Sequence, residues 1–182
     1  MTAERRLVAY LAGPEVFLSD AAEIGAAKKE ICRQHGLEGL FPGDVPEADL
    51  DLEHGRLLFR DLVAMMEQSD LLIANMTPFR GGSIDAGTAV EIGFMYARGR
   101  PVFGYTNVAG DYAARVAPNG ALVDAEGMSI EQFGLIDNLM CVAPALESGA
   151  VIVQEDVPEG ERLRDLRGFE QCVRQAAARL LS

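Results

Sequence analysis

Short apolar segments alternate along this chain with segments of helical periodicity, and the apolar segments end near glycine, proline or asparagine. Short apolar runs are typical of buried strands, whereas apolar residues at spacings of three and four indicate helices. The predicted strands cover residues 7–12, 38–41, 71–75 and 101–105. Apolar strands that alternate with helices usually form a parallel sheet. We therefore expect an α/β fold in which helices cover both faces of such a sheet.

The helical segments complete this pattern and give no sign of a second domain. They cover residues 20–34, 56–68, 87–98, about 138–147 and about 163–181. Gly36 follows the first of them and fits a helix C-terminal cap. We expect loops at the acidic residues 43–53, which include Pro46, and at residues 106–128, which are rich in Gly, Ala, Asn and Asp. The prediction is one doubly wound domain over residues 1–182, with a flavodoxin-like, five-stranded parallel sheet.

The charge balance excludes several partners. Acidic residues outnumber basic residues, 28 against 16, and the formal net charge is -12. A protein that neutralises the phosphates of nucleic acid or of a membrane surface needs a basic face, so we expect neither partner. The first residues lead straight into a strand, and no apolar run approaches the ~20 residues that span a bilayer. We therefore expect a soluble cytoplasmic protein.

Few side chains are available for a metal site. The chain has three cysteines and two histidines, with no CxxC pair. This composition argues against a disulfide framework, a zinc knuckle or a histidine-rich site. We expect no metal and no cofactor, and a small neutral molecule as the partner.

The direction of the strands predicts where a ligand binds. In doubly wound sheets, ligands bind beyond the carboxyl ends of the strands. Residues 10–17, residues 75–87 and the chain from Tyr105 onward are expected at that edge. Asp70 precedes its strand and is expected at the opposite edge, so we predict a structural role for it.

Residues 81–93 form a glycine-rich loop that leads into a helix and carries two carboxylates, Asp85 and Glu91. The loop has no lysine and no phosphate-binding glycine motif, whereas two carboxylates suit the cleavage of a glycosidic bond. The helix N-terminus is expected to favour ionisation of a nearby nucleophile. Gly87 leaves space for a ligand. The alternative is structural: Asp85 caps the helix and Glu91 is a solvated helical residue.

Asp61 is a second unusual carboxylate. It lies between Leu57 and Met65 at four-residue spacing, so its helix face is otherwise apolar. A carboxylate in such a place is expected to be paired, hydrogen-bonded or functional. An ordinary salt bridge with Arg56 or Arg60 is the alternative.

Two aromatic residues near the expected ligand edge each have two interpretations. Tyr10 is either a core tyrosine or a hydrogen-bond donor to the acidic centre. Phe17 is either a core contact or a platform on which a nucleobase stacks.

Several motifs together resemble one known family, the nucleoside 2-deoxyribosyltransferases. The resemblance covers about residues 8–145. It rests on Tyr10-Leu11-Ala12-Gly13-Pro14, Asp61-Leu62, residues 69–81, the pattern Asp85-x-Gly87-Thr88-Ala89-x-Glu91-x-Gly93, Arg100-Pro101-Val102 and Asp137-Asn138-Leu139-Met140.

The resemblance implies a catalytic role for four residues. Glu91 would be the nucleophile that attacks the anomeric carbon of a 2'-deoxyribonucleoside and forms a covalent ester. A second base would then enter from the side that the first one left, with net retention of configuration. Asp85 and Asp61 would contact and protonate the departing base, and Tyr10 would lie near the nucleophile. The partners implied are nucleosides and free nucleobases.

We predict a set of substrate-binding positions, and the resemblance also implies an oligomer. The positions are Gly13, Phe17, Asn75, Gly87 and Asn138. Asn138 would reach the hydroxyl end of the sugar in a neighbouring subunit, which implies a homo-oligomer, a dimer or an assembly of dimers, with composite active sites. Many relatives carry an acid where this chain has Asn75, and the amide either changes the base preference or is neutral.

Two other functions stay open at this point. One is hydrolysis of deoxynucleosides or their 5'-phosphates on the same fold, although Glu15 in the loop after the first strand would repel a phosphate. The other is a catalytically silent nucleoside-binding protein.

Overall fold

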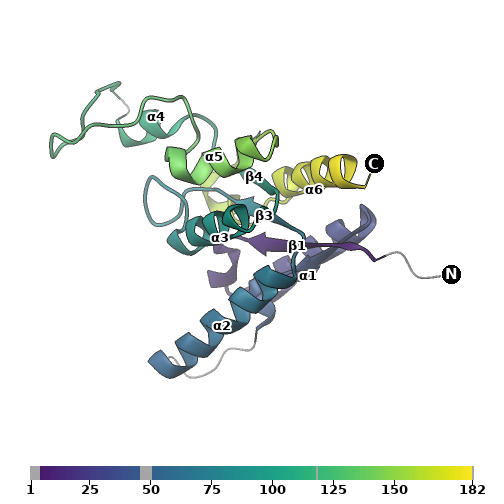
Figure 1. Ribbon diagram of the computed structural model, residues 1–182. Coiled ribbons are helices and arrows are strands. Elements are labelled where there is room, and N and C mark those ends of the chain that lie inside the picture. The colour runs from purple at the N-terminus through teal and green to yellow at the C-terminus, as the bar shows by residue number, and fades with distance from the viewer. Residues whose placement is uncertain (1–4, 46–50, 118, 182) are drawn as a thin grey trace.

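The computed structural model describes residues 5–45, 51–117 and 119–181, and it confirms the predicted α/β fold (Figure 1). Within these residues, five strands form one parallel sheet in the order β2-β1-β3-β4-β5. The strands are β1 Leu7–Ala12, β2 Leu37–Leu40, β3 Leu71–Asn75, β4 Val102–Thr106 and β5 Val153–Gln154. The strand order reverses between β1 and β3, which is where doubly wound folds bind ligands.

Helices cover both faces of the sheet, and the strand residues alternate between two apolar cores. The helices are α1 Ala21–Gln34, α2 Leu52–Gln68, α3 Ala86–Ala97, α4 Tyr112–Val116, α5 Leu139–Glu147 and α6 Arg167–Leu180. Leu11 and Ile73 contribute to the core under α1 and α6. Tyr10 and Leu72 contribute to the core under α3 and α5. This alternation directs Tyr10 towards the helix that carries Glu91.

The structure shifts some of the predicted element boundaries. α2 starts four residues before the expected position 56, because Asp51 caps it by accepting a hydrogen bond from the His54 backbone N–H at 2.8 Å. α6 starts at Arg167 rather than near residue 163. α4 lies inside the expected loop 106–128, which is therefore not entirely loop. Residues 46–50 of the expected acidic loop lie outside the described residues.

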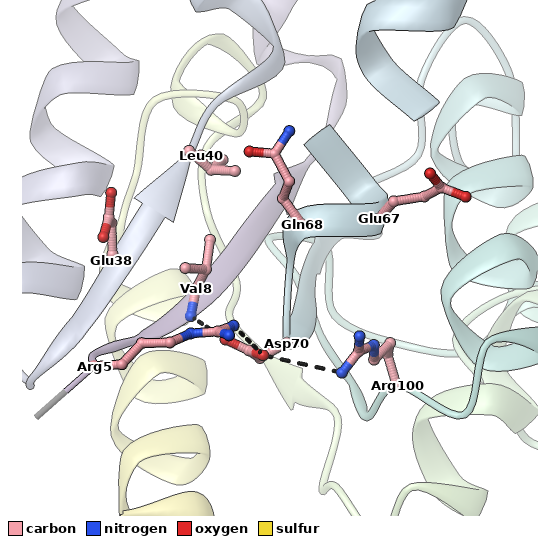
Figure 2. Close-up of a pocket in the computed structure, with 8 residues that line it drawn as sticks. All are labelled: Arg5, Val8, Glu38, Leu40, Glu67, Gln68, Asp70 and Arg100. Atoms are coloured by element: carbon pink, nitrogen blue, oxygen red, sulfur yellow. Dashed lines mark hydrogen bonds and ion pairs between the residues drawn. The ribbon is translucent and has the colours of Figure 1, made fainter. Parts of the chain in front are cut away.

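Asp70 lies at the edge opposite the carboxyl ends of the strands, as expected, and lines a cavity of about 480 Å³ there (Figure 2). Its carboxylate accepts hydrogen bonds from Arg5 at 2.8 Å and from the Val8 backbone N–H at 2.9 Å. The Arg100 guanidinium is 3.9 Å away. These contacts tie the start of β1 to the start of β3, which is a structural role.

Candidate active site

Glu91 and Tyr10 meet where α3 packs over β1. The Tyr10 hydroxyl donates a hydrogen bond to Glu91 Oε1 at 2.6 Å, and the Tyr10 side chain is buried in the core beneath α3. Glu91 is partly buried at the sixth position of α3. The arrangement agrees with both interpretations of Tyr10: it is a core tyrosine, and its hydroxyl is a hydrogen-bond donor to Glu91.

The surroundings of Glu91 favour its protonated form. Burial raises the pKa of the Glu91 carboxyl to about 7, the negative charge of Asp85 also raises it, and the hydrogen bond from Tyr10 lowers it. The helix N-terminus was expected to keep the nucleophile ionised, but its effect fades beyond the first turn, and Glu91 lies past that turn. Burial is therefore the largest influence on the pKa of Glu91. Burial and Glu91 together raise the pKa of Tyr10, so the phenol stays a proton donor.

Asp85 caps α3, as the structural interpretation proposed, and its charge also acts on Glu91. Its Oδ2 accepts hydrogen bonds from the Thr88 backbone N–H at 2.9 Å and from the Thr88 hydroxyl at 3.3 Å. In the described part of the chain, Asp85 Oδ1 accepts no hydrogen bond from the protein. The cap thus fixes the carboxyl group and leaves one oxygen for another partner. The structure brings together Tyr10, Asp85 and Glu91, as the sequence predicted.

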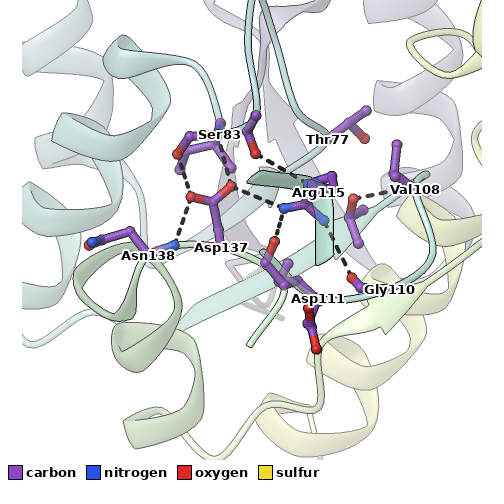
Figure 3. A network of polar contacts seen from close by, with 12 residues as sticks. Thr77, Ser83, Val108, Gly110, Asp111, Arg115, Asp137 and Asn138 are labelled. Carbon is purple, nitrogen blue, oxygen red and sulfur yellow. Dashed lines mark hydrogen bonds and ion pairs between the residues drawn. The ribbon is translucent and has the colours of Figure 1, made fainter. Parts of the chain in front are cut away.

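The loop that carries Asp85 is held from the other side by Asp137 (Figure 3). Asp137 is buried and accepts hydrogen bonds from the Ser83 hydroxyl, from the Ile84 backbone N–H at 3.0 Å and from the Asn138 backbone N–H at 2.8 Å. The Arg115 guanidinium lies 3.7 Å from its Oδ2. These bonds place the start of α5 beside the start of α3.

Asn138 caps α5, and its side chain is fixed within its own chain. Its Oδ1 accepts a hydrogen bond from the Met140 backbone N–H at 3.0 Å, and its Nδ2 donates to Glu131 Oε1 at 2.7 Å. Glu131 Oε2 also accepts from the Leu139 backbone N–H at 2.8 Å. Within the described residues, the Asn138 amide donates one hydrogen bond, the one to Glu131. Its predicted contact with a sugar in a neighbouring subunit stays a prediction.

Asn75 lies in a buried polar network behind the ligand edge. Its Nδ2 donates to Glu15 Oε1 at 2.8 Å, and its Oδ1 accepts from the Thr77 backbone N–H at 3.0 Å. Glu15 Oε1 also accepts from Lys28 Nζ at 2.6 Å and from the Tyr105 hydroxyl at 2.9 Å. The Asn75 amide is thus used internally, and its predicted role towards substrate stays a prediction.

Gly13 and Gly87 lie beside acidic side chains. A Cβ at Gly13 would lie 2.0 Å from Glu15 Oε2, and a Cβ at Gly87 would lie 2.9 Å from Asp85 Oδ2. The glycines let the carboxylates approach the backbone. Their predicted contact with substrate stays a prediction.

The environments of Phe17 and Asp61 in the structure differ from those that their structural interpretations predict. Phe17 is 56% exposed and stacks on Phe79, so it is not a core contact. Asp61 is exposed, and in the described residues its carboxylate pairs with neither Arg56 nor Arg60. The alternative of an ordinary salt bridge with these arginines is therefore wrong, and an exposed Asp61 needs no such partner because the apolar face of α2 is largely uncovered. The predicted catalytic role of Asp61 stays a prediction.

Two residues of this site, Lys28 and Glu131, were missed from the sequence, and Glu15, which was expected to repel a phosphate, was not expected to be buried. Glu15 and Lys28 form a fully buried ion pair. Neither residue clearly interrupts an apolar pattern in the sequence, so the pattern does not predict their burial. Glu131 lies seven residues before Asn138 in an irregular segment, where no periodicity links the two. In the described part of the chain, no three His, Cys, Asp or Glu side chains gather where they could hold a metal ion. No helix described here is long and apolar enough to cross a membrane.

Comparison with known proteins identifies the family. A family model described as nucleoside 2-deoxyribosyltransferase matches residues 9–140. The chain belongs to the nucleoside 2-deoxyribosyltransferase family. The part of the chain that matches the nucleoside 2-deoxyribosyltransferase model includes Tyr10, Asp61, Asp85, Glu91 and Asn138.

Solved structures share the fold of this nucleoside 2-deoxyribosyltransferase family member. A 2-desoxiribosyltransferase from Leishmania mexicana is similar with a TM-score of 0.71 and 24% identity, over 96% of this chain and 99% of that chain. A conserved protein from Enterococcus faecalis V583 is similar with a TM-score of 0.56 and 24% identity, over 94% of this chain and 99% of that chain. At these identities the likeness establishes the fold.

A curated relative is similar along almost its whole length. The uncharacterized protein C191.05c of Schizosaccharomyces pombe is 28% identical over 197 residues, which are 95% of this chain and 90% of that protein. Family and fold therefore support an enzyme of the glycosyltransferase type.

Proposed function

We propose that this protein exchanges the nucleobase of 2'-deoxyribonucleosides through a covalent deoxyribosyl ester on Glu91. One observation carries the proposal: the Glu91 carboxylate is hydrogen-bonded to Tyr10 at 2.6 Å and lies within the electrostatic influence of Asp85, the cap of α3. A nucleophilic carboxylate and a second carboxyl group are the equipment of retaining glycosyl transfer.

In the first step, a Glu91 oxygen attacks the anomeric carbon as the bond from this carbon to the base nitrogen breaks. The electron pair of that bond goes to the base. In the reacting form Glu91 is ionised and Asp85 holds the proton. Asp85 donates this proton to the base, which makes the base a better leaving group, and Asp61 contacts the base. The positive charge that develops on the sugar is stabilised by the adjacent Glu91 carboxylate. The products are a neutral base and a deoxyribosyl–Glu91 ester.

In the second step, a nitrogen of another base attacks the same carbon from the side that the first base left. The ester bond breaks, Glu91 leaves as a carboxylate, and the proton of the incoming base returns to the aspartate. Two inversions at one carbon give net retention of configuration. The Tyr10 hydroxyl stabilises the Glu91 carboxylate before attack and after release, since it donates to the charged form.

The functional unit that we propose is a homo-oligomer in which Asn138 completes the site of a neighbouring subunit. Exposed apolar side chains on α2 support this proposal: the exposed fractions are 81% for Leu52, 48% for Leu57 and 63% for Phe59. In Figure 1, α2 projects past the sheet on one side, and α4 with the loop after it projects on another. Such apolar surfaces are typical of interfaces, and closed dimers are the commonest soluble oligomers. Asp61, exposed on α2, would then lie at this interface.

The decisive experiment supplies deoxyinosine with and without free adenine. Exchange predicts deoxyadenosine and hypoxanthine only when adenine is present, and no product for the Glu91→Ala variant. Release of free deoxyribose at the same rate with and without adenine would instead show a hydrolase.

A further inference from the structure

Arg80, Phe79 and Phe17 form a small cluster at the edge where the substrate is expected. The rings of Phe17 and Phe79 are stacked, with centroids 5.4 Å apart and planes 10° apart. The Arg80 guanidinium carbon lies 4.6 Å from the Phe79 centroid and 5.3 Å from the Phe17 centroid. A guanidinium over aromatic faces is attracted by the ring quadrupole. The cluster thus holds a flexible arginine in one place.

The loop around Arg80 is built to keep it there. Arg80 has φ 54°, and in the described part of the chain it is the one residue other than glycine with positive φ. The Phe79 backbone N–H donates to the Ser83 carbonyl at 2.9 Å, which closes the loop. Arg115 Nε donates to the Gly82 carbonyl at 3.2 Å. Strained backbone that is held by surrounding bonds clusters at ligand-binding sites.

The Arg80 guanidinium differs from other arginines of the chain in its hydrogen bonds. Within the described residues it donates to no protein oxygen, whereas Arg5, Arg33, Arg164 and Arg167 each bond a carboxylate. The chain has a net charge of -12, so carboxylates that could pair with an arginine are plentiful. An exposed arginine that rests on two rings instead presents its N–H groups to a ligand.

The cluster comes from the two segments that flank the reacting groups. Phe17 ends the short 3-10 helix Pro14–Phe17 after β1, the strand of Tyr10. Phe79 and Arg80 lie in the loop that connects β3 to Asp85, the cap of α3. Parallel β1 and β3 are hydrogen-bonded neighbours, with Ala12 opposite Ala74 at their carboxyl ends. Phe17, Arg80 and Asp85 therefore belong to the same edge of the sheet.

We propose that Arg80 determines base specificity, by donating hydrogen bonds to nucleobases that carry a keto oxygen on the edge away from the sugar. The inference rests on the proposed function and deepens it. Arginine has N–H donors and no acceptor, so it matches a keto oxygen and opposes an exocyclic amino group. The half-exposed ring of Phe17 supplies a flat face on which the base stacks. Hypoxanthine and uracil fit this chemistry, and adenine and cytosine, the corresponding amino bases, do not.

The test compares two matched pairs of donors, deoxyinosine with deoxyadenosine and deoxyuridine with deoxycytidine, with one common acceptor base. The variant is Arg80→Asn, because asparagine tolerates the positive φ at this position. The control is Arg98→Asn, an exposed arginine at the far end of α3 with a contact of 3.8 Å to Glu67. We expect the keto-to-amino ratio of kcat/KM to fall about tenfold in Arg80→Asn, the effect of one lost bidentate contact, and to stay unchanged in Arg98→Asn.

A second measurement separates this inference from the proposed function. Binding of free hypoxanthine and free adenine to wild type and Arg80→Asn is measured by calorimetry, without turnover. If exchange occurs and neither the kcat/KM ratio nor the binding ratio changes in Arg80→Asn, the inference is overturned and the proposed function stands. If no donor reacts but Arg80→Asn still removes the preference for hypoxanthine, the inference stands and the proposed function fails. A third outcome would also overturn the inference. If Arg80→Asn no longer distinguishes deoxyinosine from its 5'-phosphate, while its keto-to-amino ratios stay unchanged, Arg80 contacts a phosphate and not the base.

Discussion

Tyr10 on β1 donates a hydrogen bond to Glu91 on α3 at 2.6 Å, so one phenol joins the sheet to the helix that carries the proposed nucleophile. Burial raises the pKa of Glu91 to about 7, and the bond from Tyr10 opposes that shift. The nucleophile must be ionised, so activity should rise with pH through this pKa and be lost below it.

Replacing Tyr10 by phenylalanine should move the acid limb of the kcat/KM profile to higher pH. The variant loses the hydrogen bond that favours ionised Glu91, so the pKa of Glu91 rises further. A hydrogen bond to a charged group contributes about 1.5 kcal/mol, which predicts about a tenfold loss of activity on the acid limb. Rates measured between pH 5 and pH 9 check this, and an unmoved acid limb would show that the bond does not control the ionisation of Glu91.

Asp85→Asn should move the same acid limb in the opposite direction. Asparagine still caps α3, but the negative charge that raises the pKa of Glu91 is gone, so Glu91 ionises at lower pH. Loss of the proton donor should also lower kcat by about 10² to 10⁴. The control is Asp111→Asn, a cap of the same kind on α4, where Asp111 accepts from the Ala114 backbone N–H at 2.7 Å. Equal activity of the two variants would contradict the role of Asp85.

Mixing two inactive variants should restore activity if the sites are shared between subunits. Glu91→Ala lacks the nucleophile, and Asn138→Ala lacks the amide that we assign to the neighbouring site. If subunits exchange at random in a dimer, half of the dimers are mixed and each has one intact site, so about a quarter of wild-type activity should return. The readout is exchange activity after co-refolding, with the oligomer size measured by light scattering. An inactive mixture of proven hetero-oligomers would contradict composite sites.

Lys28→Met should destabilise the fold strongly. Lys28 and Glu15 are fully buried at 2.6 Å, and removal of the lysine leaves a buried carboxylate unpaired. We expect a loss of about 3–5 kcal/mol in the free energy of unfolding, measured with denaturant. The control is Arg33→Ala, which breaks an exposed pair with Glu30 and should leave the free energy of unfolding almost unchanged. The double variant Glu15→Gln/Lys28→Met should recover part of the loss, and equal losses for Lys28→Met and Arg33→Ala would contradict the importance of the buried pair.

The fold could be predicted from local pattern because its main strands are continuous apolar runs. β1 and β3 were located to the residue, since each is bounded by turn residues and buried on both sides. β5 has two residues, Val153 and Gln154, and its pairing depends on the tertiary position of β4. The start of α2 depends on one side-chain cap, Asp51. Neither the two-residue strand β5 nor the Asp51 cap of α2 produces a periodic pattern in the sequence.

The candidate site could be predicted in part, because its carboxylates belong to a continuous motif. Asp85 and Glu91 lie six residues apart on one loop and helix, so their proximity follows from local geometry. Glu15, Lys28 and Tyr105 meet only after the strands pack, across 13 and 90 residues of sequence. Asp61 lies on an otherwise apolar helix face, but a pattern on one helix does not show whether the same chain covers that face.

The central claim is tested most directly by intact-protein mass spectrometry after brief mixing of the protein with deoxyinosine and no acceptor base. We predict that wild type gains the mass of one deoxyribosyl group, that peptide mapping places it on Glu91, and that adding adenine removes it as deoxyadenosine appears. Glu91→Gln should gain nothing. Efficient formation of deoxyadenosine by a Glu91→Gln variant, or a deoxyribosyl group on any other residue, would contradict the account.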